Sequence, residues 1–342
     1  MKRDRKVDIL KELRNKNVPV DVHWELTNRC NENCIHCLRD NRKVRELTLK
    51  EIKDIMLQLK KEGCFTLTFS GGEPFLRKDF RDILEFAYQQ QFKVKILTNG
   101  TLINQKYIGL LKKIKPIFIQ LSLYGASSQM HDSITQVKGS FKKTMKAIRL
   151  LEEHQITVKI MVMCLNRNFP ELLALKRMAK KRKWNIVFDF QIFPTYLKKK
   201  APIHLRTTDE QIAFARRKKI LTWPCDLKPQ DRKKRPPVSL FNYTPSISVQ
   251  GDLHPSVLMR IKLGNLRKSS FHDIWHNSAK VRRLRSISEK QFDCFYCKYY
   301  TFCCRVPEMA YLEQGNFLVK SKEICRINNL VQKSKVERLN KS

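Results

Sequence analysis

Three cysteines near the start of the chain, Cys30, Cys34 and Cys37, have a spacing suited to metal chemistry. They occur in the stretch CNENCIHC, and His36 lies between two of them, where simultaneous ligation is geometrically awkward. A structural zinc site would use four Cys or His ligands, and a ferredoxin-type cluster would use four cysteines. Three thiolates on a [4Fe–4S] cluster leave one iron open. An open metal position is where a small molecule can bind and react.

A second group of cysteines lies toward the other end of the chain, in CFYCKYYTFCC and beyond it. The chain has eleven cysteines, and an odd number without an export signal argues against a disulfide framework. Clustering favours a metal site instead. The members of this second group are Cys294, Cys297, Cys303, Cys304 and Cys325.

Apolar strand-like runs alternate with helical patterns over the first two thirds of the chain. The expected strands are 21–27, 65–70, 93–98, 117–123, 157–164 and 185–193, and the expected helices are 48–63, 78–91, 104–113, 140–154, 170–182 and 207–220. Such β/α units imply a parallel sheet covered by helices, either an incomplete barrel or a doubly wound sheet. In both architectures the chemistry gathers at the carboxyl ends of the strands.

The pattern changes after about residue 220. The segment WPCDLKPQDRKKRPP is rich in proline and charge and indicates a linker, and SISVQGDLHPSVL beyond it indicates a hairpin. We therefore expect three parts: an N-terminal helical extension at 1–20, an α/β unit at 21–225, and a linker with a second domain at 226–342.

The composition is that of a strongly basic globular protein. The chain of 342 residues has a formal net charge of +37 and is 42% hydrophobic. Lys and Arg are spread over most helices, so the charge is either a solvated surface or an attraction for an acidic partner. The chain has no apolar run typical of a signal peptide and no stretch long enough for a membrane span. We expect a cytoplasmic protein without a membrane partner.

The second expected strand ends in SGGEP (70–74), where paired glycines allow a close backbone approach to a ligand. Together with the cysteine triplet, this motif resembles the radical S-adenosylmethionine (SAM) enzymes. The resemblance covers about residues 20–190 and implies an α/β fold, a partial (β/α)6 TIM-like barrel. It implies that Cys30, Cys34 and Cys37 hold a [4Fe–4S] cluster whose open iron is chelated by SAM. Reductive cleavage of SAM then yields a 5′-deoxyadenosyl radical that abstracts a substrate hydrogen.

The same resemblance implies contacts to SAM at several strand ends. The motifs SGGEP, LTNGT, LSLYG and CLNRN supply most of them, and the aromatic residue before the last cysteine packs near adenine. In many relatives an aspartate stands at the position of Tyr124, so substrate contacts differ here. The implied SAM contacts are His36, Gly71, Gly72, Glu73, Asn99, Ser122 and Asn166.

The second cysteine group resembles the SPASM extension of this family, over about residues 240–330. A full SPASM domain carries two auxiliary iron–sulfur clusters. Here the position expected to hold a ligand of the first cluster is Ser256, and Val306 and Pro307 stand where a further cysteine is expected. We therefore expect one auxiliary [4Fe–4S] cluster, with zinc as the alternative at that site and Cys304 as a possible substitute ligand. The expected ligands are Cys294, Cys297, Cys303 and Cys325.

Members with a SPASM extension mostly modify peptides, so the resemblance implies a ribosomally synthesised peptide as the substrate. A basic enzyme surface would steer an acidic leader. Fewer than 25 residues precede the first strand, so we expect no separate N-terminal peptide-recognition domain. The electron donor would be a protein such as flavodoxin or ferredoxin. Since no RNA-binding module is evident, the charge alone does not indicate a nucleic-acid partner.

Two further cysteines bear on the reaction. Cys225 lies in the Pro-rich segment that could cover the barrel mouth, and Cys164 ends the fifth expected strand. Peptide epimerases that resemble this chain return a hydrogen atom from a thiol to the peptide Cα radical, which gives a D-residue. We expect epimerisation with Cys225 as donor, and Cys164 is the second candidate. The alternatives are a maturase that forms thioether or carbon–carbon cross-links, a non-catalytic iron–sulfur protein, and an RNA-modifying enzyme.

Overall fold

The computed structural model describes residues 12–13, 16–39, 43–196, 201–221, 244–300, 303 and 305–339. Two cysteines singled out from the sequence, Cys225 and Cys304, lie outside these residues, as does most of the extension expected at 1–20.

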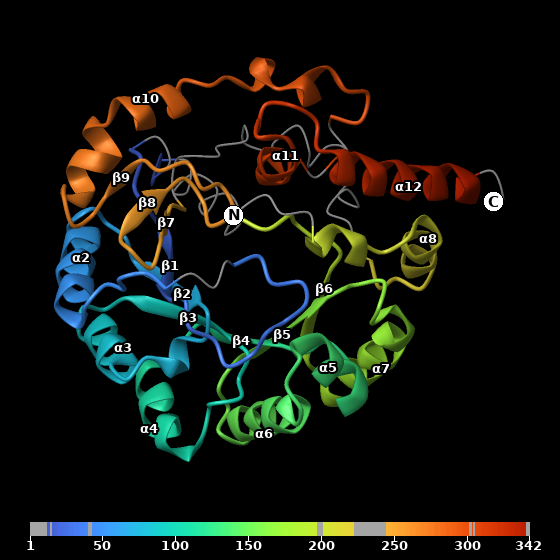
Figure 1. Ribbon diagram of the computed structural model, residues 1–342, viewed down its shortest axis with the longest axis horizontal. Helices are drawn as coiled ribbons and strands as arrows, with labels where there is room; N and C mark the ends of the chain where they lie inside the picture. Colours follow the sequence, from blue (N-terminus) through green and yellow to red (C-terminus); the bar gives the residue numbers. More distant parts are fainter. Residues whose placement is uncertain are drawn as a thin grey trace, which may run out of the picture.

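Six parallel strands form a curved sheet with helices on its outer side (Figure 1). The strands follow one another across the sheet in chain order, which confirms the expected partial barrel. They are β1 Asp21–Thr27, β2 Thr66–Gly71, β3 Lys93–Thr98, β4 Phe118–Ser122, β5 Val158–Met163 and β6 Asn185–Asp189. The helices of this part are α2 Leu49–Lys61, α3 Phe80–Gln89, α4 Gln105–Ile114, α5 Ser128–Thr135, α6 Ser140–Glu153, α7 Leu172–Arg182 and α8 Asp209–Arg217.

Local sequence explains why α2 begins where it does. The Thr48 side chain accepts a hydrogen bond from the Glu51 N–H, and the Glu51 carboxylate accepts one from the Thr48 N–H, which is the expected capping box. Ile52, Met56 and Leu59 are fully buried on one face of the helix. The short helix α5 was not expected, because its sequence SQMHDSIT has few apolar residues to give a helical period.

The two faces of the sheet differ in chemistry. Trp24, Leu67 and Phe69 are fully buried in the apolar core that the outer helices cover. Alternate residues point to the opposite face of a strand, so His23 and Ser70 lie on the inner side, where they line a cavity. The barrel interior therefore carries polar side chains among apolar ones, although the strands read as apolar runs.

The second part of the chain extends the same sheet. β7 (Ser246–Ile247) pairs in parallel with β1, and β8 (Asp252–His254) pairs antiparallel with β7, which confirms the expected hairpin. β9 (Gly264–Asn265) completes a sheet of nine strands in the part of the chain that is described. The remaining elements are the π-helical turn η5 Asp273–Asn277 and the helices α10 Ala279–Arg285, α11 Pro307–Gln314 and α12 Lys322–Leu339.

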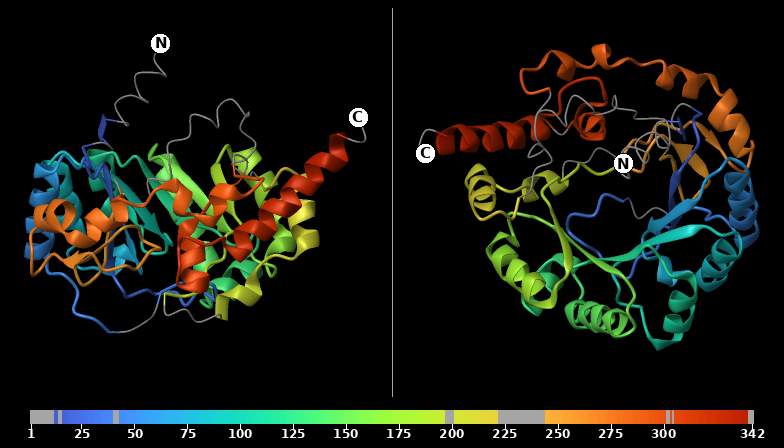
Figure 2. Two further views of the ribbon diagram at one scale, coloured as in Figure 1. Left: turned by 90° about the horizontal axis from the view of Figure 1, so that it is seen from above. Right: turned by 180° about the vertical axis from the view of Figure 1, so that it is seen from behind.

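The last helix lies beside the end of the barrel. Figure 2 shows α12 running along α8, and Arg326 of α12 donates a 2.9 Å hydrogen bond to the Thr207 carbonyl. Arg206 pairs with Glu313 of α11 at 2.9 Å. These contacts hold the C-terminal helices against the open edge of the barrel. Among the residues described, none of the helices is both long and apolar enough to cross a bilayer.

Replacing Asn168 tests how the end of β5 is held. Its side chain is fully buried, accepts from the Leu165 N–H at 2.8 Å, and donates to the Tyr124 and Met163 carbonyls at 2.9 Å. Asn168→Ala leaves these groups without partners, so we expect the free energy of unfolding to fall by about 2–4 kcal/mol in urea titrations. The neighbouring Asn166→Ala removes an exposed hydrogen bond and should cost less than about 1 kcal/mol. Equal costs would contradict this assignment.

Candidate active site

The loop that carries the first three cysteines follows β1 and is held by backbone contacts. The N–H groups of Asn33 and Ile35 donate to the carbonyls of Thr135 and Ile134, each at 3.0 Å. The unexpected helix α5 therefore anchors the loop from the far side of the sheet. A loop without regular structure needs such partners to present side chains in a fixed arrangement.

The three cysteines face one cavity of about 310 Å³ at the carboxyl ends of the strands. Most of the side chains expected at the SAM site lie on its wall, and the strand ends of β2 to β5 all contribute. Of the predicted residues, those that line it are Cys30, Cys34, Cys37, His36, Gly71, Gly72, Asn99 and Ser122. Glu73 and Asn166 are not on its wall.

The surroundings of two of the cysteine thiols favour their protonated form, which metal binding would change. Burial raises the pKa of Cys30 and of Cys34, and the negative charge of Glu32 raises the pKa of Cys34 further. Burial also raises the pKa of Glu32 to about 7, and its Oε1 has no hydrogen-bond partner. Metal coordination deprotonates thiols outright, so a bound iron–sulfur cluster would turn these thiols into thiolate ligands.

The paired glycines are required by close packing. A Cβ on Gly72 would lie 1.9 Å from the Arg29 carbonyl oxygen, and Gly71 has a φ of +121° with the Thr27 oxygen 2.5 Å from an added Cβ. The Gly72 N–H donates to the Thr27 carbonyl at 2.6 Å. The loop that carries Cys30, Cys34 and Cys37, here called the cluster loop, is therefore in backbone contact with the end of β2. Any residue other than glycine at these two positions would prevent this contact.

Glu73 is completely buried behind the cavity wall. Its carboxylate accepts from the Thr98 hydroxyl at 2.7 Å, the Asn99 N–H at 2.8 Å and the Phe75 N–H at 3.1 Å. Burial raises its pKa to about 7, while these hydrogen bonds oppose the rise. The carboxylate thus ties β2 to β3, and its expected contact with the SAM amino group remains a prediction.

Asn99 connects the third strand end to the cluster loop. Its Nδ2 donates to Asn31 Oδ1 at 2.9 Å, and its Oδ1 accepts from the Thr101 N–H at 2.9 Å. Asn31 in turn donates to the Thr101 hydroxyl at 2.8 Å. The sequence singled out Asn99 but missed Asn31, although Asn31 directly follows the first cysteine.

His36 forms an aromatic wall with Tyr124. The two rings meet edge to face with centroids 4.7 Å apart, and Tyr124 stacks on His131 at 5.6 Å. Burial lowers the pKa of His36 to about 4, and its Nδ1 has no hydrogen-bond partner. A neutral ring with an unsatisfied polar atom beside the cavity suits an adenine, which offers both a π-face and hydrogen-bonding nitrogens.

The end of β5 presents different residues from those expected. Met161 and Met163 line the cavity, so the alternate residue Cys164 points into the apolar core, where it is fully buried. Asn166 donates to the His204 carbonyl at 2.8 Å. The geometry therefore gives no support to Cys164 as a hydrogen donor or to Asn166 as a SAM contact.

Residues from the second part of the chain also reach this site. Arg260 pairs with Glu25 of β1 at 2.6 Å, and its guanidinium lies 3.9 Å from the centroid of the Tyr196 ring. Tyr196 and Glu25 line the cavity. Neither Arg260 nor Tyr196 was found from the sequence, because their pairing depends on tertiary contact between distant segments.

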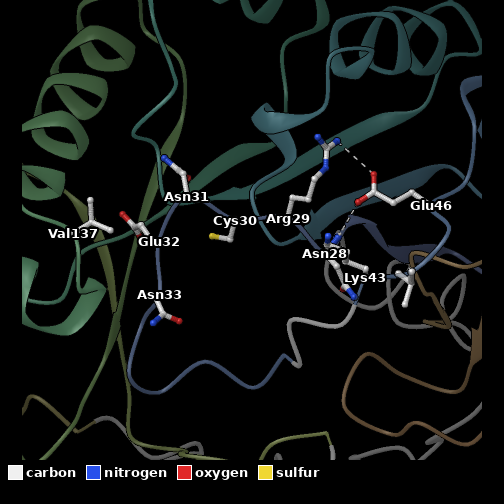
Figure 3. A pocket seen from close by; sticks show the side chains of 10 residues that line it. Asn28, Arg29, Cys30, Asn31, Glu32, Asn33, Lys43, Glu46 and Val137 are labelled. Carbon is white, nitrogen blue, oxygen red and sulfur yellow. Dashed lines mark hydrogen bonds and ion pairs between the residues drawn. The ribbon is translucent and has the colours of Figure 1, made fainter.

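A larger pocket of about 880 Å³, here called the outer pocket, borders the cluster loop, and Figure 3 shows the side chains that line it. Cys30 and Glu32 border both hollows. Arg29 pairs with Glu46 at 3.5 Å on the wall of the outer pocket. The loop therefore contributes to the walls of both hollows.

The second cysteine group also converges in space. Cys294, Cys303 and Cys325 line a small cavity of about 20 Å³. Burial raises the pKa of Cys294, and the nearby Cys325 and Cys297 raise it further, so Cys297 belongs to the same group. At the position where a first auxiliary cluster would have a ligand, Ser256 hydrogen-bonds the Glu308 carboxylate. The four described thiols fit one cluster.

Comparison with known proteins identifies the family. Residues 24–179 match the radical SAM superfamily, and residues 241–298 match SPASM, an iron–sulfur cluster-binding domain. These matches show that the chain contains a radical SAM domain and a SPASM domain. A radical SAM protein requires a [4Fe–4S] cluster and SAM, and a SPASM domain binds auxiliary iron–sulfur clusters.

Three similar proteins illustrate the range of this family. The AdoMet-dependent heme synthase of Methanosarcina barkeri is 24% identical over 88% of this chain and 95% of its own length. The antilisterial bacteriocin subtilosin biosynthesis protein AlbA of Bacillus subtilis is 29% identical over 80% of this chain, but the match spans only 63% of AlbA. The crystal structure of Streptococcus suis SuiB bound to precursor peptide SuiA has 17% identity and a TM-score of 0.67, and the match covers 95% of this chain and 80% of SuiB.

Substituting Gly72 tests the close contact between the two loops of the radical SAM site. Gly72→Ala places a methyl group against the Arg29 carbonyl, so we expect SAM affinity in equilibrium dialysis to fall at least about tenfold. Gly109→Ala is the matched control, because Gly109 lies in helix α4 with open space around its Cβ. This control should raise stability by about 0.5–1 kcal/mol and leave SAM binding intact. An unchanged affinity of the Gly72 variant would contradict the contact.

Iron analysis tests the cluster ligands. Two [4Fe–4S] clusters give about eight irons per chain, so replacing Cys30, Cys34 and Cys37 together with Ala should leave about four and abolish SAM cleavage. Replacing Cys294 and Cys297 should also leave about four. About twelve irons in the unmodified protein would mean that a third cluster exists and that the Ser256 site is intact.

Proposed function

We propose that this radical SAM protein modifies a ribosomally synthesised peptide. The supporting observation is the 29% identity to AlbA, named for biosynthesis of a bacteriocin, in a chain whose cysteine cavity is walled by Met161, Met163 and Tyr196. Flexible methionines and aromatic rings adapt to peptide side chains of varied shape. The likeness to SuiB, solved with its precursor peptide, adds a related fold.

Different residues of the cavity would bind the cluster, SAM and the peptide. Cys30, Cys34 and Cys37 hold the reactive cluster, and Gly71, Gly72, Asn99 and Ser122 orient SAM beside it. His36 and Tyr124 provide the aromatic wall for adenine. When bound, the cluster and SAM supply a 5′-deoxyadenosyl radical by reductive cleavage. Arg260, Glu25 and Tyr196 shape the side of the cavity from which a peptide would enter.

For the reaction itself we propose epimerisation. Abstraction of a Cα hydrogen from an L-residue leaves a planar radical, and a thiol on the opposite face returns a hydrogen atom to give the D-residue. The sulfur radical that remains would take one electron from the external electron donor and one proton from solvent to become a thiol again. Cys225 is the proposed donor and lies outside the described residues. The burial of Cys164 in the core supports choosing Cys225 over Cys164.

The partners follow from the same site. The net charge of +37 favours a peptide with an acidic leader through long-range attraction. An electron donor such as flavodoxin or ferredoxin would approach the outer pocket, because Cys30, a proposed ligand of the reactive cluster, also borders that pocket.

A second candidate function comes from the relative that this chain matches over most of both lengths. The AdoMet-dependent heme synthase aligns with 95% of its own chain, whereas the AlbA match spans 63% of AlbA. A tetrapyrrole is therefore the alternative substrate class. Product analysis distinguishes peptide modification from conversion of a tetrapyrrole, because only the first changes a peptide.

Mass spectrometry of a candidate peptide tests the proposed reaction. The peptide is incubated anaerobically in D2O with the reconstituted enzyme, SAM and a reductant. Epimerisation should add one mass unit per modified residue, because the thiol hydrogen exchanges with solvent. A loss of two hydrogens would indicate a cross-link and would overturn epimerisation. An unchanged peptide together with conversion of a tetrapyrrole would overturn peptide modification.

The donor cysteine is tested separately. Cys225→Ala should still cleave SAM but form no D-residue, because the peptide radical lacks a hydrogen source. Cys164→Ala is the matched control, since the thiol of Cys164 is buried away from the cavity, and it should form the D-residue at the normal extent per cleaved SAM. Retained epimerisation in the Cys225 variant would remove that residue from the mechanism.

A further inference from the structure

Three side chains outside the cofactor cavity form a compact donor set. Glu62, His272 and His276 each offer one ligand atom, and these atoms all lie within 4.8 Å of one another. His272 Nδ1 is 2.9 Å from Glu62 Oε1, and His276 Nε2 is 2.8 Å from Glu62 Oε2. In the part of the chain that is described, this is the only such group of three His, Cys, Asp or Glu side chains.

The two histidines are held on one helical face. They are four residues apart in a segment that enters the π-helical turn η5, and their ring centroids are 4.9 Å apart. Residues at this spacing lie side by side on a helix. π-Helical turns are rare and often mark functional positions. The two imidazoles are thus placed so that both can coordinate one metal ion.

The backbone under the site is tightly anchored to the barrel. Phe271 and Trp275 are buried, the Phe271 N–H donates to Gln58 Oε1 at 2.7 Å, and the Trp275 Nε1 donates to the Asn17 carbonyl at 2.6 Å. Arg267 pairs with Glu51 of α2 at 2.6 Å. Figure 1 shows this orange segment lying along α2. The ligands are therefore pre-positioned by contacts that do not involve the ligands themselves.

The site lies at the opposite end of the barrel from the reactive cavity. Glu62 caps the C-terminal end of α2, just before β2 begins, whereas the cluster loop lies at the carboxyl ends of the strands. β2 has six residues and so spans about 20 Å. A metal here would be remote from the reactive cavity, and it would join the radical SAM barrel to the SPASM segment.

We propose that Glu62, His272 and His276 bind a zinc ion. Two imidazole nitrogens and a carboxylate oxygen are a common zinc donor set, and water fills the fourth position. The ion would replace the hydrogen bonds that now join both rings to the carboxylate. Nickel and copper suit the same nitrogen donors, whereas magnesium and calcium prefer oxygen ligands.

Zinc retention by the holoenzyme tests this proposal. Tag-free protein is first loaded anaerobically with its iron–sulfur clusters, so that the cluster cysteines are occupied, then treated with zinc chloride and desalted. Elemental analysis should find about one zinc per chain with unchanged iron. His272→Ala and His276→Ala should each lose the zinc. His154→Ala is the matched control at the end of α6, away from any such group among the described residues, and should keep it.

A second measurement guards against misfolding of a variant. Glu62→Gln keeps the size of the side chain but loses its charge, so we expect zinc affinity by titration calorimetry to fall at least about tenfold. Zinc should raise the melting temperature of the wild-type holoenzyme by about 2 °C or more, and not that of His276→Ala. The proposal is overturned if the wild type retains no zinc, or if the wild type and the histidine variants retain it equally.

Discussion

Glu73 connects, through its carboxylate and its backbone N–H, the segments on which the cofactor cavity depends. It accepts hydrogen bonds from Thr98 and Asn99 at the end of β3, and the Glu73 N–H donates to the Arg29 carbonyl in the cluster loop at 2.8 Å. A buried carboxylate without such partners would be costly. The carboxylate binds the end of β3 and the Glu73 N–H binds the cysteine loop, so the β2 end, the β3 end and that loop are positioned together.

The cysteine loop has no helix or strand of its own, so its shape comes from its neighbours. Gly72 packs against the Arg29 carbonyl from one side, while Asn33 and Ile35 bond to α5 from the other. Asn31 adds a side-chain link to Asn99. The loop thereby becomes a wall shared by an inner cavity and an outer pocket, with Cys30 on both.

The SPASM domain is joined to the barrel at both ends of the strands. β7 pairs directly with β1, which extends the barrel sheet into the second domain. Near the cavity, Arg260 reaches Glu25, and at the opposite end His272 and His276 reach Glu62. Among the described residues, no further parallel strand follows β6 in the sheet, and α11 and α12 contact α8 and its preceding turn on that side. The second domain is thus part of the support of the active site.

The sequence by itself determined the positions of the strands along the chain, the cysteine triplet and the glycine pair. These features are local: periodicity predicts strands and helices, and the triplet with GGEP identifies the family. Tertiary structure decided what depends on side-chain direction and on distant pairing. It turned Cys164 into the core and Met163 into the cavity, because successive residues of a strand face opposite sides. It placed Glu73 behind the wall of the cofactor cavity. It also brought Arg260 to Glu25 and His272 to Glu62, pairs that are more than two hundred residues apart in the sequence. No local sequence pattern carries a signal over such separations.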